Sequence, residues 1–446
     1  MKNHPFATRS ALRFPRPGLF AATAFACTGL LALGTPTRAL ADGGDTRTSS
    51  KDKNPVIEKK DESRIKYSAF VQAGITGNFQ DPDDHQNFGR IVDDRANEPL
   101  LNQATFTIER PLAPEPGRFD FGFKAQAGYG SDGRFYNTTG TLENVQHDIV
   151  QPYVVEAYGN VHAPLGFLGK DAGLDFRFGQ FATLLGAETI DPRTNTFYSH
   201  NYIYNFGVPY QHLGALFTLH ANPTFDVYAG VTRGVNTSIY DNNGRAAFLG
   251  GFGVNGLLGG KLSLLLTTSS GPENPRETIG FPAYNGSGFA RRNDFRFYNT
   301  AVITYKPTDK LTSITELCYT YDDGFDASFF GGAETLAYAI NDKVSAAIRL
   351  EAVRDSEGFF VAQFAANDDF TNLERGGIQL DRRTVGGGEN TYLEATLGVQ
   401  IKPLKYLTIR PEVRGDYATN NDFGGPFDDS SKQWSFTVGT DVIIAF

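Results

Sequence analysis

The chain has 446 residues, of which 40% are hydrophobic, 13% aromatic and 20% charged, and its formal net charge is −9. This acidic balance argues against nucleic acid as a partner and leaves no basic patch for anionic lipid. The 49 glycines and the scarcity of Met and Trp indicate many strands joined by turns, and after the N-terminal leader no apolar run approaches the ~18 residues of a membrane-spanning helix.

The first 41 residues predict a secretory signal peptide. Residues 2–16 form a basic start, residues 18–34 an apolar core, and residues 39–41, Ala-Leu-Ala, a small-x-small cleavage site. Cys27 lies inside the apolar core and follows Ala-Phe-Ala, which disfavours a lipoprotein anchor at this position. The protein is therefore expected to be exported.

The exported chain has 405 residues after removal of the 41-residue leader, with 36 basic and 50 acidic side chains and a net charge of −14. Cys318 is its only cysteine, so no intramolecular disulfide can form. Residues 42–64 are charged and almost free of large apolar side chains, so they cannot bury enough surface to order themselves. We predict a flexible periplasmic tail there, followed by a single domain at residues 65–446.

This domain alternates apolar and polar side chains, most clearly in the final stretch QWSFTVGTDVIIAF, as a half-buried strand does. Sixteen segments alternate in this way, although Phe70, Leu216, Leu265 and Ile314 intrude on the polar face. In chain order they read YSAFVQAGI, QATFTIE, FDFGFKAQAGY, YVVEAYGNV, LDFRFG, LGALFTL, FDVYAGV, FLGGFGV, LSLLLTT, FYNTAVITY, LTSITELCYTY, TLAYAI, VSAAIRLEA, YLEATLGVQI, LTIRPEVRGDY and QWSFTVGTDVIIAF.

Every second connection between these segments is short: PLAPEPGR, HAPLGFLGKDAG, HANPT, NGLLGG, KPTDK, NDK and KPLKY. The others are expected to be long and polar. Short periplasmic turns alternating with long outer loops are typical of transmembrane barrels, whose closed sheet satisfies every backbone group in lipid. We predict an all-β fold, a transmembrane antiparallel β-barrel of about 16 strands in the bacterial outer membrane, with 14 or 18 strands as alternatives. A soluble β-sandwich or a secreted adhesin is the other architecture.

Six stretches carry a more specific signal: LNQATFTIERPL (101–112), IDPRTNTFYSHNYIYNFGVPYQHLG (190–214), VYAGVTRGVN, FLGGF, TYKPTDKLT and KPLKYLTIRPEVRGDY. Together they resemble the putative outer-membrane β-barrel porins of the OmpL-like type, over roughly residues 66–446. The resemblance implies a porin-like pore and names no solute. The terminal Phe446 resembles the signal by which such barrels are handed to the barrel-assembly machinery.

The alternation directs twelve charged side chains into the predicted lumen. They are Glu109, Lys124, Glu156, Arg177, Glu316, Arg349, Glu351, Glu394, Arg410, Glu412, Arg414 and Asp416. Facing water, they would set a transverse field and a modest ion preference. The alternative is cross-strand pairing that only holds the wall, expected above all for the last four, whose signs alternate. Acidic outer stretches such as DPDDH and FDDSS suit divalent cations at the lipopolysaccharide surface, or loop solvation.

The third long connection, about residues 181–208, is rich in aromatic rings and is broken by Pro192 and Gly207. A sixteen-stranded barrel leaves a channel too wide for its wall side chains to fill. In general porins, to which the chain is similar in strand count, the third outer loop folds inward. We therefore predict a constriction loop, with Phe197, Tyr204 and Phe206 packing it to the wall. Its polar groups are predicted to be Asp191, Arg193, Asn195, Tyr198, His200, Asn201, Tyr202 and Asn205.

The predicted function is passive diffusion of small hydrophilic solutes. One alternative is a channel selective for sugars or organic acids, in which Tyr198, Tyr202, Tyr204 and Tyr210 form an aromatic track. Another is a non-conducting structural or adhesive barrel that binds through residues 354–390. A homotrimer is usual for barrels of this size, but no interface can be read from an alternating apolar wall.

Enzymatic and metal chemistry lack the required patterns. Ser199 and His200 are neighbours, which in an extended chain point to opposite sides, and there is no G-x-S-x-G elbow. The seven histidines are scattered without H-E-x-x-H, the DPDDH stretch lacks the spacing of an EF-hand, and VGGGEN has no following helix for a phosphate. We predict no catalytic residues, no metal and no cofactor.

Overall fold

The computed structural model describes residues 64–446 except for 115–116, 139, 143–148, 242, 274–278, 281–288, 291–292, 325, 362–388 and 422–423. The predicted signal peptide, the predicted tail up to residue 63 and most of the candidate adhesive loop lie outside the described residues. All described residues belong to one compact unit, Pro36–Phe446.

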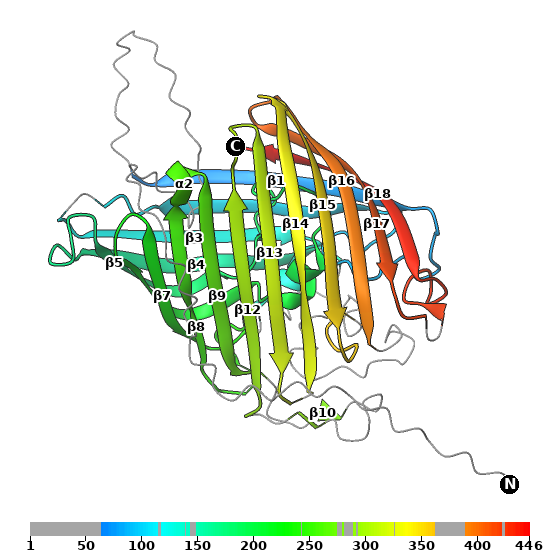
Figure 1. Ribbon diagram of the computed structural model, residues 1–446, viewed down its shortest axis with the longest axis horizontal. Coiled ribbons are helices and arrows are strands. Elements are labelled where there is room, and N and C mark those ends of the chain that lie inside the picture. The colour runs from blue at the N-terminus through cyan, green and yellow to red at the C-terminus, as the bar shows by residue number, and fades with distance from the viewer. Residues whose placement is uncertain are drawn as a thin grey trace. The chain divides into compact units, whose positions relative to one another are not determined.

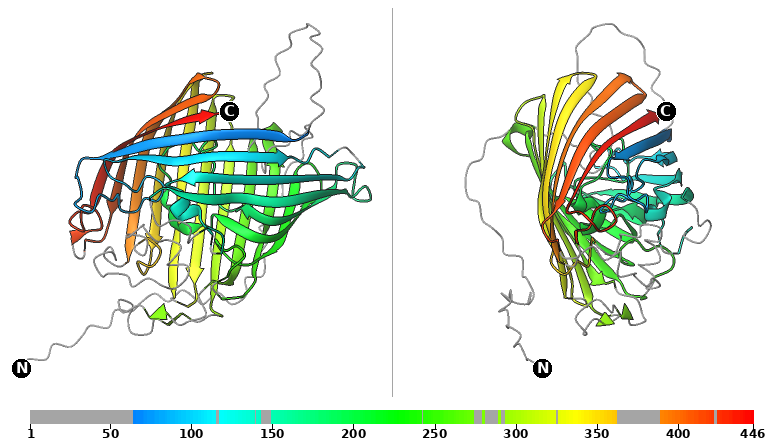
Figure 2. Two further views of the ribbon diagram at one scale, coloured as in Figure 1. Left: turned by 180° about the vertical axis from the view of Figure 1, so that it is seen from behind. Right: turned by 90° about the vertical axis from the view of Figure 1, so that its right-hand side faces the viewer.

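Sixteen strands form one closed antiparallel barrel, which confirms the predicted fold and strand number (Figures 1 and 2). They are β1 (Lys66–Asn78), β2 (Pro99–Arg110), β3 (Asp120–Gly130), β4 (Gln151–Pro164), β5 (Gly173–Ala182), β6 (Gln211–His220), β7 (Phe225–Thr232), β8 (Ala247–Gly256), β9 (Leu262–Pro272), β12 (Phe295–Tyr305), β13 (Leu311–Asp322), β14 (Ala327–Asn341), β15 (Val344–Asp355), β16 (Asn390–Leu404), β17 (Leu407–Ala418) and β18 (Trp434–Ala445). Each pairs with its neighbour along the chain, and β1 pairs with β18, from Phe70↔Ala445 to Asn78↔Thr437, to close the sheet.

Outside the wall, β10 (Ile279–Gly280) pairs with β11 (Phe289–Ala290). The helical elements are α1 (Gly133–Tyr136), α2 (Leu257–Gly260) and a π-helix, η1 (Ile203–Gly207). Among the described residues, none of these helices is long and apolar enough to cross a membrane.

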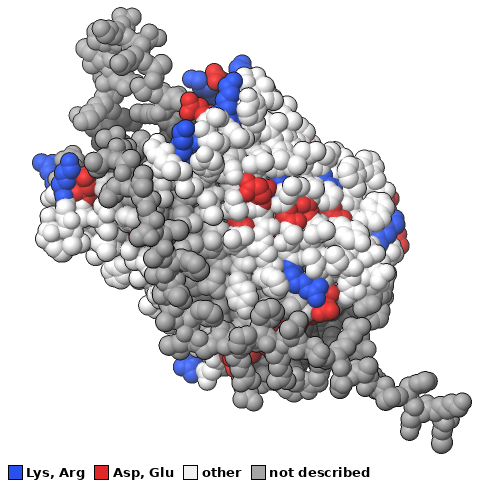
Figure 3. All heavy atoms as spheres, viewed as in Figure 1, with Lys and Arg blue, Asp and Glu red and all other residues white. Residues whose placement is uncertain are grey.

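The wall strands turn apolar side chains outward and polar ones inward. On β13, for example, Leu317 and Tyr319 are exposed, whereas Glu316 and Thr320 are buried on the lumen side. Figure 3 shows that the outer surface over β12–β16 is largely free of charged side chains. Because the closed sheet satisfies its own backbone groups, such a surface can face hydrocarbon.

The connections alternate between short and long with one exception. The outer connection at residues 323–326 is short, because β13 and β14 remain paired as far as Asp322↔Ala327. The prediction that every outer connection is long was therefore wrong at this position.

The main hydrophobic cluster of the described chain lies inside the barrel, between the outer loops and the inner wall. We name four of these loops L1 (residues 79–98), L2 (131–150), L3 (183–210) and L4 (233–246). Their buried members of the cluster are Ile91, Val92, Phe135, Tyr136, Leu185, Ile190, Tyr202, Ile203, Tyr204, Phe206, Val208, Tyr210 and Val235. The outer loops thus build a packed core within the lumen.

Candidate functional site

L3 leaves the wall at the end of β5 and returns at the start of β6, where the Thr183 amide donates to the Tyr210 carbonyl at 2.9 Å. The apolar positions of its second half, among them Tyr202, Ile203 and Phe206, are almost fully buried. Its chain closes into the short π-helix η1 and becomes extended again at Val208. L3 therefore has an ordered backbone path, and side chains of the opposite wall hold it there.

Three carboxylates of that wall accept hydrogen bonds from L3. Glu412 on β17 accepts from the amides of residues 198 and 199 at 2.8 and 3.1 Å. Glu351 on β15 accepts from the amides of residues 202 and 203 at 2.7 and 2.9 Å. Glu316 on β13 accepts from the Ala187 amide at 3.0 Å and from the Asn201 side-chain amide at 3.1 Å. Each of these carboxyl groups therefore fixes one short segment of L3.

Three arginines donate to L3 carbonyls. The Arg410 guanidinium reaches the carbonyls of residues 192 and 195 at 2.9 and 2.8 Å. Arg349 reaches the Ser199 carbonyl at 2.9 Å, and Arg414 reaches the His200 carbonyl at 2.5 Å. Together with the three carboxylates, they form what we call the L3 cradle: Glu316, Arg349, Glu351, Arg410, Glu412 and Arg414.

The cradle arginines also have acidic partners. Arg410 pairs with Asp441 at 2.5 Å, and Arg414 pairs with Asp416 at 2.7 Å. Arg349 pairs with Glu188 of L3 at 2.6 Å and, at 3.2 Å, with Glu394. All these side chains except that of Glu188 are buried. Of the four charged residues expected to pair with one another, Arg414 and Asp416 do so, whereas Arg410 and Glu412 have other partners. A pore-lining role for these residues stays a prediction.

The remaining predicted pore-lining residues lie on the opposite wall, β2–β5. Lys124 pairs with Glu156 at 2.5 Å across β3 and β4, and its side chain is 25% exposed. Glu109 lies beside Lys124 in the register of β2 and β3. The Arg177 guanidinium lies 4.5 Å from the centre of the Tyr158 ring. These side chains are on average less covered than the cradle, so charge on this wall is more accessible.

The eight predicted constriction residues fall into three groups. Asp191 and Arg193 pair at 2.7 Å, are partly exposed, and the Arg193 guanidinium lies over the Phe70 ring. Asn195 and Asn201 line a small pocket between L3 and the wall. The other four are buried within the packing of the loops: Tyr198, His200, Tyr202 and Asn205.

The aromatic rings of L3 pack against several partners. The Phe197 ring lies 5.0 Å from the Arg349 guanidinium on the wall, as predicted for a residue that packs the loop to it. Tyr204, by contrast, contacts L2: its hydroxyl lies 2.7 Å from the Tyr136 hydroxyl. That Tyr204 also packs the loop to the wall stays a prediction.

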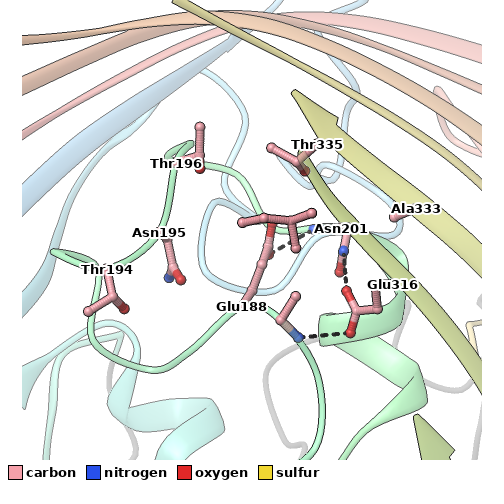
Figure 4. Close-up of a pocket in the computed structure, with 10 residues that line it drawn as sticks. Glu188, Thr194, Asn195, Thr196, Asn201, Glu316, Ala333 and Thr335 are labelled. Carbon is pink, nitrogen blue, oxygen red and sulfur yellow. Dashed lines mark hydrogen bonds between the residues drawn. The ribbon is translucent and has the colours of Figure 1, made fainter. Parts of the chain in front are cut away.

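The pocket opens between L3 and strands β13 and β14 (Figure 4). Its lining residues are Ala187, Glu188, Thr194, Asn195, Thr196, Asn201, Ile314, Glu316, Ala333 and Thr335. None of them is basic. Burial acts to raise the pKa of Glu188, but the nearby Arg349 and His200 outweigh it and lower that pKa to about 2. The pocket therefore presents carboxylates, hydroxyls and amides to a solute.

Neither of the neighbouring residues considered for hydrolysis is arranged for it. The Ser199 hydroxyl accepts a hydrogen bond from Arg349 at 3.3 Å, and His200 Nδ1 lies 2.6 Å from Glu188. A nucleophile needs a base within reach, and here each of the two has a different partner. Within the described part of the chain, no three His, Cys, Asp or Glu side chains are grouped to hold a metal ion.

L1 and L2 add contacts that the sequence did not predict. Arg134 of L2 binds both oxygens of Asp94 in L1, at 2.9 and 2.7 Å. Arg90 of L1 pairs with Asp93 at 2.5 Å and with Asp416 on the wall at 2.9 Å. The available signal was the stretch GRIVDDR in L1, where two branched apolar residues stand among charges in an otherwise polar loop.

One further carboxyl, Asp132 of L2, accepts hydrogen bonds from the side-chain amides of Asn102 and Gln103, both at 3.0 Å. Burial raises the pKa of Asp132 to about 7, against the opposing effect of these bonds. Its stabilising contribution should thus be complete below about pH 4 and be lost as pH rises through 7, by at most about 4 kcal/mol. Denaturant unfolding at pH 4 and pH 8 should show this slope, and Asp132→Asn should flatten it.

The exposed Asp81 of L1 provides the matched control. Asp81→Asn should leave the slope between pH 4 and pH 8 unchanged. An Asp132→Asn protein with the wild-type slope would show that another group is responsible.

Comparisons with known proteins agree on one kind of molecule. A family model described as putative beta-barrel porin-2, OmpL-like, matches residues 64–446. No curated protein matches the sequence. Three similar solved structures show the fold, each at low identity and each aligned over 86% of this chain.

They are the outer-membrane channel DcaP of Acinetobacter baumannii (11% identity, 97% of that chain, TM-score 0.51), OprB of Pseudomonas putida (13%, 94%, 0.52) and an anion-selective porin from Comamonas acidovorans (8%, 99%, 0.51). These three structures resemble this chain in barrel architecture. The family and these neighbours are porins and not enzymes.

Proposed function

Since the chain belongs to the family described as putative beta-barrel porin-2, OmpL-like, and is an outer-membrane barrel, we propose that it forms a water-filled channel for passive diffusion of small hydrophilic solutes. L3 constricts this channel, and the route passes between L3 and β13–β14. The observation that carries the proposal is the polar pocket at that position, lined on one side by L3 and on the other by the wall.

The purified barrel should give stepwise conductance in a planar lipid bilayer. Porin channels select ions by rings of charged side chains and by pore width. The pocket carries two carboxylates and no basic side chain. A correctly folded barrel that conducts no ions would contradict the proposal and favour the structural or adhesive alternative.

Glu316→Gln should reduce the preference of the channel for cations over anions, because it removes one of the two carboxylates at the pocket. The amide can still bond to Asn201, so L3 should stay docked and unit conductance should change less than selectivity. Reversal potentials in a salt gradient measure this. Glu109→Gln on the opposite wall is the control; an equal shift there would place the filter elsewhere.

A channel selective for sugars is less well supported. The four tyrosines proposed as an aromatic track are all buried: Tyr198, Tyr202, Tyr204 and Tyr210. Rings buried in this way have no free face on which a sugar could stack. Flux that saturates with one solute, or block by that solute, would revive this alternative.

Export and assembly complete the proposal. The leader at residues 1–41 directs secretion, residues 42–64 remain a periplasmic tail, and lipopolysaccharide surrounds the outer loops. Phe446, the proposed assembly signal, exchanges backbone hydrogen bonds with Ala69 at 2.8 and 3.2 Å and keeps its ring exposed. An exposed terminal ring is suited to recognition by the barrel-assembly machinery.

A further inference from the structure

A row of histidine and aspartate side chains crosses the inner wall at the periplasmic ends of β4 to β8. These five strands are neighbours in the barrel (Figure 1). The adjacent residues Val161 and Phe225 are exposed on the outer face, so the row points into the lumen. Each strand contributes one member close to a short turn. We call these residues the mouth row: His162, Asp175, His220, Asp226 and Asn255.

Four hydrogen bonds join the mouth row from end to end. One oxygen of Asp175 accepts from His162 Nδ1 at 2.5 Å, and the other accepts from His220 Nε2 at 3.2 Å. Asp226 accepts from His220 Nδ1 at 2.6 Å and from the Asn255 side-chain amide at 2.9 Å. The strand register places each histidine directly opposite an aspartate, His162 opposite Asp175 and His220 opposite Asp226. The pairing of the strands therefore holds the row in place.

The contacts of His220 define its charge. Each of its two ring nitrogens faces a carboxylate oxygen, and an ionised carboxylate can only accept hydrogen bonds. A neutral imidazole has a single N–H, so only the imidazolium form donates on both sides. The geometry therefore gives His220 a positive charge between two negative ones.

The mouth row is partly open to the lumen, unlike the cradle. The side chains of Asp175 and His220 are 26% and 22% exposed, whereas that of Arg349 in the cradle is fully buried. On the opposite wall, β14, β15 and β17 carry uncharged side chains at inward positions close to the short turns. These are Ala339, Ser345 and Thr408. The row thus presents its charges to a passing ion from one side of the channel.

The mouth row is also well separated from L3. L3 leaves β5 after Ala182, seven residues along the strand from Asp175. At about 3.3 Å per residue, the two positions are roughly 20 Å apart. This separation exceeds the Debye length of about 8 Å at physiological ionic strength. The row and the L3 pocket therefore act on an ion at different stages of its passage.

We propose that the mouth row is a second selectivity station, at which the His220 imidazolium offsets Asp175 and Asp226 and so limits the preference of the channel for cations. This inference rests on the proposed function, because it requires the barrel to conduct. Charged side chains that line a pore set which ions it favours. Arg177, at the next inward position of β5, adds a positive charge beside the row. Removal of the His220 charge leaves the carboxylates in excess over their present balance.

Reversal potentials of the full mature barrel in a planar bilayer, under a gradient of potassium chloride, test this station. His220→Gln should raise the ratio of potassium to chloride permeability about twofold to fivefold, the effect of one unit charge a few Å from a passing ion. The Gln amide can still donate to one carboxylate, which favours a folded wall. Asp226→Asn should lower the ratio, because it removes a negative charge and keeps the imidazolium. His85→Gln, in the exposed part of L1, is the control and should leave the ratio unchanged.

The possible outcomes separate this inference from the channel proposal. A conducting His220→Gln barrel with the wild-type permeability ratio would overturn the station and leave the channel intact. A silent wild-type barrel would contradict the channel itself. Retained heat-modifiable gel mobility would show that each variant is folded.

The charge of His220 can be measured without ion flow. Nitrogen NMR of the full mature barrel, with labelled histidine rings in detergent micelles, should show a proton on both ring nitrogens of His220 at about pH 7.5, where free histidine is mostly neutral. The signal that disappears in His220→Gln assigns the residue. An unprotonated ring nitrogen in His220 under these conditions would refute the inference.

Discussion

Deletion of residues 193–205 should raise the unit conductance of the channel severalfold in a planar bilayer. This segment contains most of the L3 groups that the cradle holds, from the Asn195 carbonyl to the Ile203 amide. The sixteen wall strands pair with one another and do not need L3 to close the sheet. Its removal would leave the charged cradle facing water, so the lumen would be both wider and more polar.

A shortened periplasmic turn provides the control for this deletion. Residues 166–170, between β4 and β5, are exposed, so their removal should leave unit conductance unchanged. Retained heat-modifiable gel mobility would show that both variants are folded. Unaltered conductance after the L3 deletion would mean that L3 does not limit the flow of ions.

Arg349→Met should destabilise the barrel by about 3–5 kcal/mol, the usual effect of removing one partner from a buried ion pair. The Arg349 guanidinium bonds to Glu188, to Glu394 and to the Ser199 carbonyl, and all three would lose a donor. Unfolding by denaturant in detergent measures the change. Single-channel records should also become noisier, because L3 loses its link between β15 and Glu188.

Three further variants sharpen this result. Arg349→Lys keeps the charge but not the planar fork of donors, so its effect should be intermediate. Adding Glu394→Gln to Arg349→Met should recover part of the lost stability, since one unpaired carboxylate is then removed. Arg177→Ala, on the less covered wall, should cost no more than about 1 kcal/mol. Equal losses for Arg349→Met and Arg177→Ala would contradict a special role for the cradle.

The barrel could be predicted because each strand of a membrane barrel records its two environments in alternate residues. In β18, apolar positions such as Trp434 and Val442 are exposed on the outer face, while Thr437 and Asp441 are buried on the inner face. The seven short periplasmic turns then fix which ends of the strands lie together. Both signals are local in sequence, so a single chain suffices to read them.

The four apolar residues on the inward face show what the alternation pattern cannot predict. Phe70 lies under Arg193 of L3, Leu216 and Leu265 pack against the cluster of loop residues, and Ile314 lines the pocket. Each faces inward as its parity requires, but each is covered by a loop and not by water. Alternation identifies the face of a residue and cannot identify what fills the lumen in front of it.

For the cradle, the sequence predicted the direction of the side chains but not their partners in the lumen. Arg349, Glu351 and Glu412 were expected to point inward, and they do. Their partners, however, are main-chain groups of L3, some 150 to 214 residues away in sequence. Main-chain amides and carbonyls are common to nearly all residues. The sequence of L3 therefore does not show which of them the wall will bind.

This mode of attachment has a consequence for how such channels diversify. Most of the bonds from the cradle go to peptide groups, which do not depend on the side chains that L3 carries; the exceptions are the bonds to the side chains of Glu188, Ser199 and Asn201. The wall can therefore hold loops that differ in sequence, provided that their backbones follow a similar path. Residues that face the solute can then be substituted while the loop stays attached. An engineer can use the same separation, exchanging Thr194 or Thr196 at the pocket to build a sensing pore without redesigning the barrel.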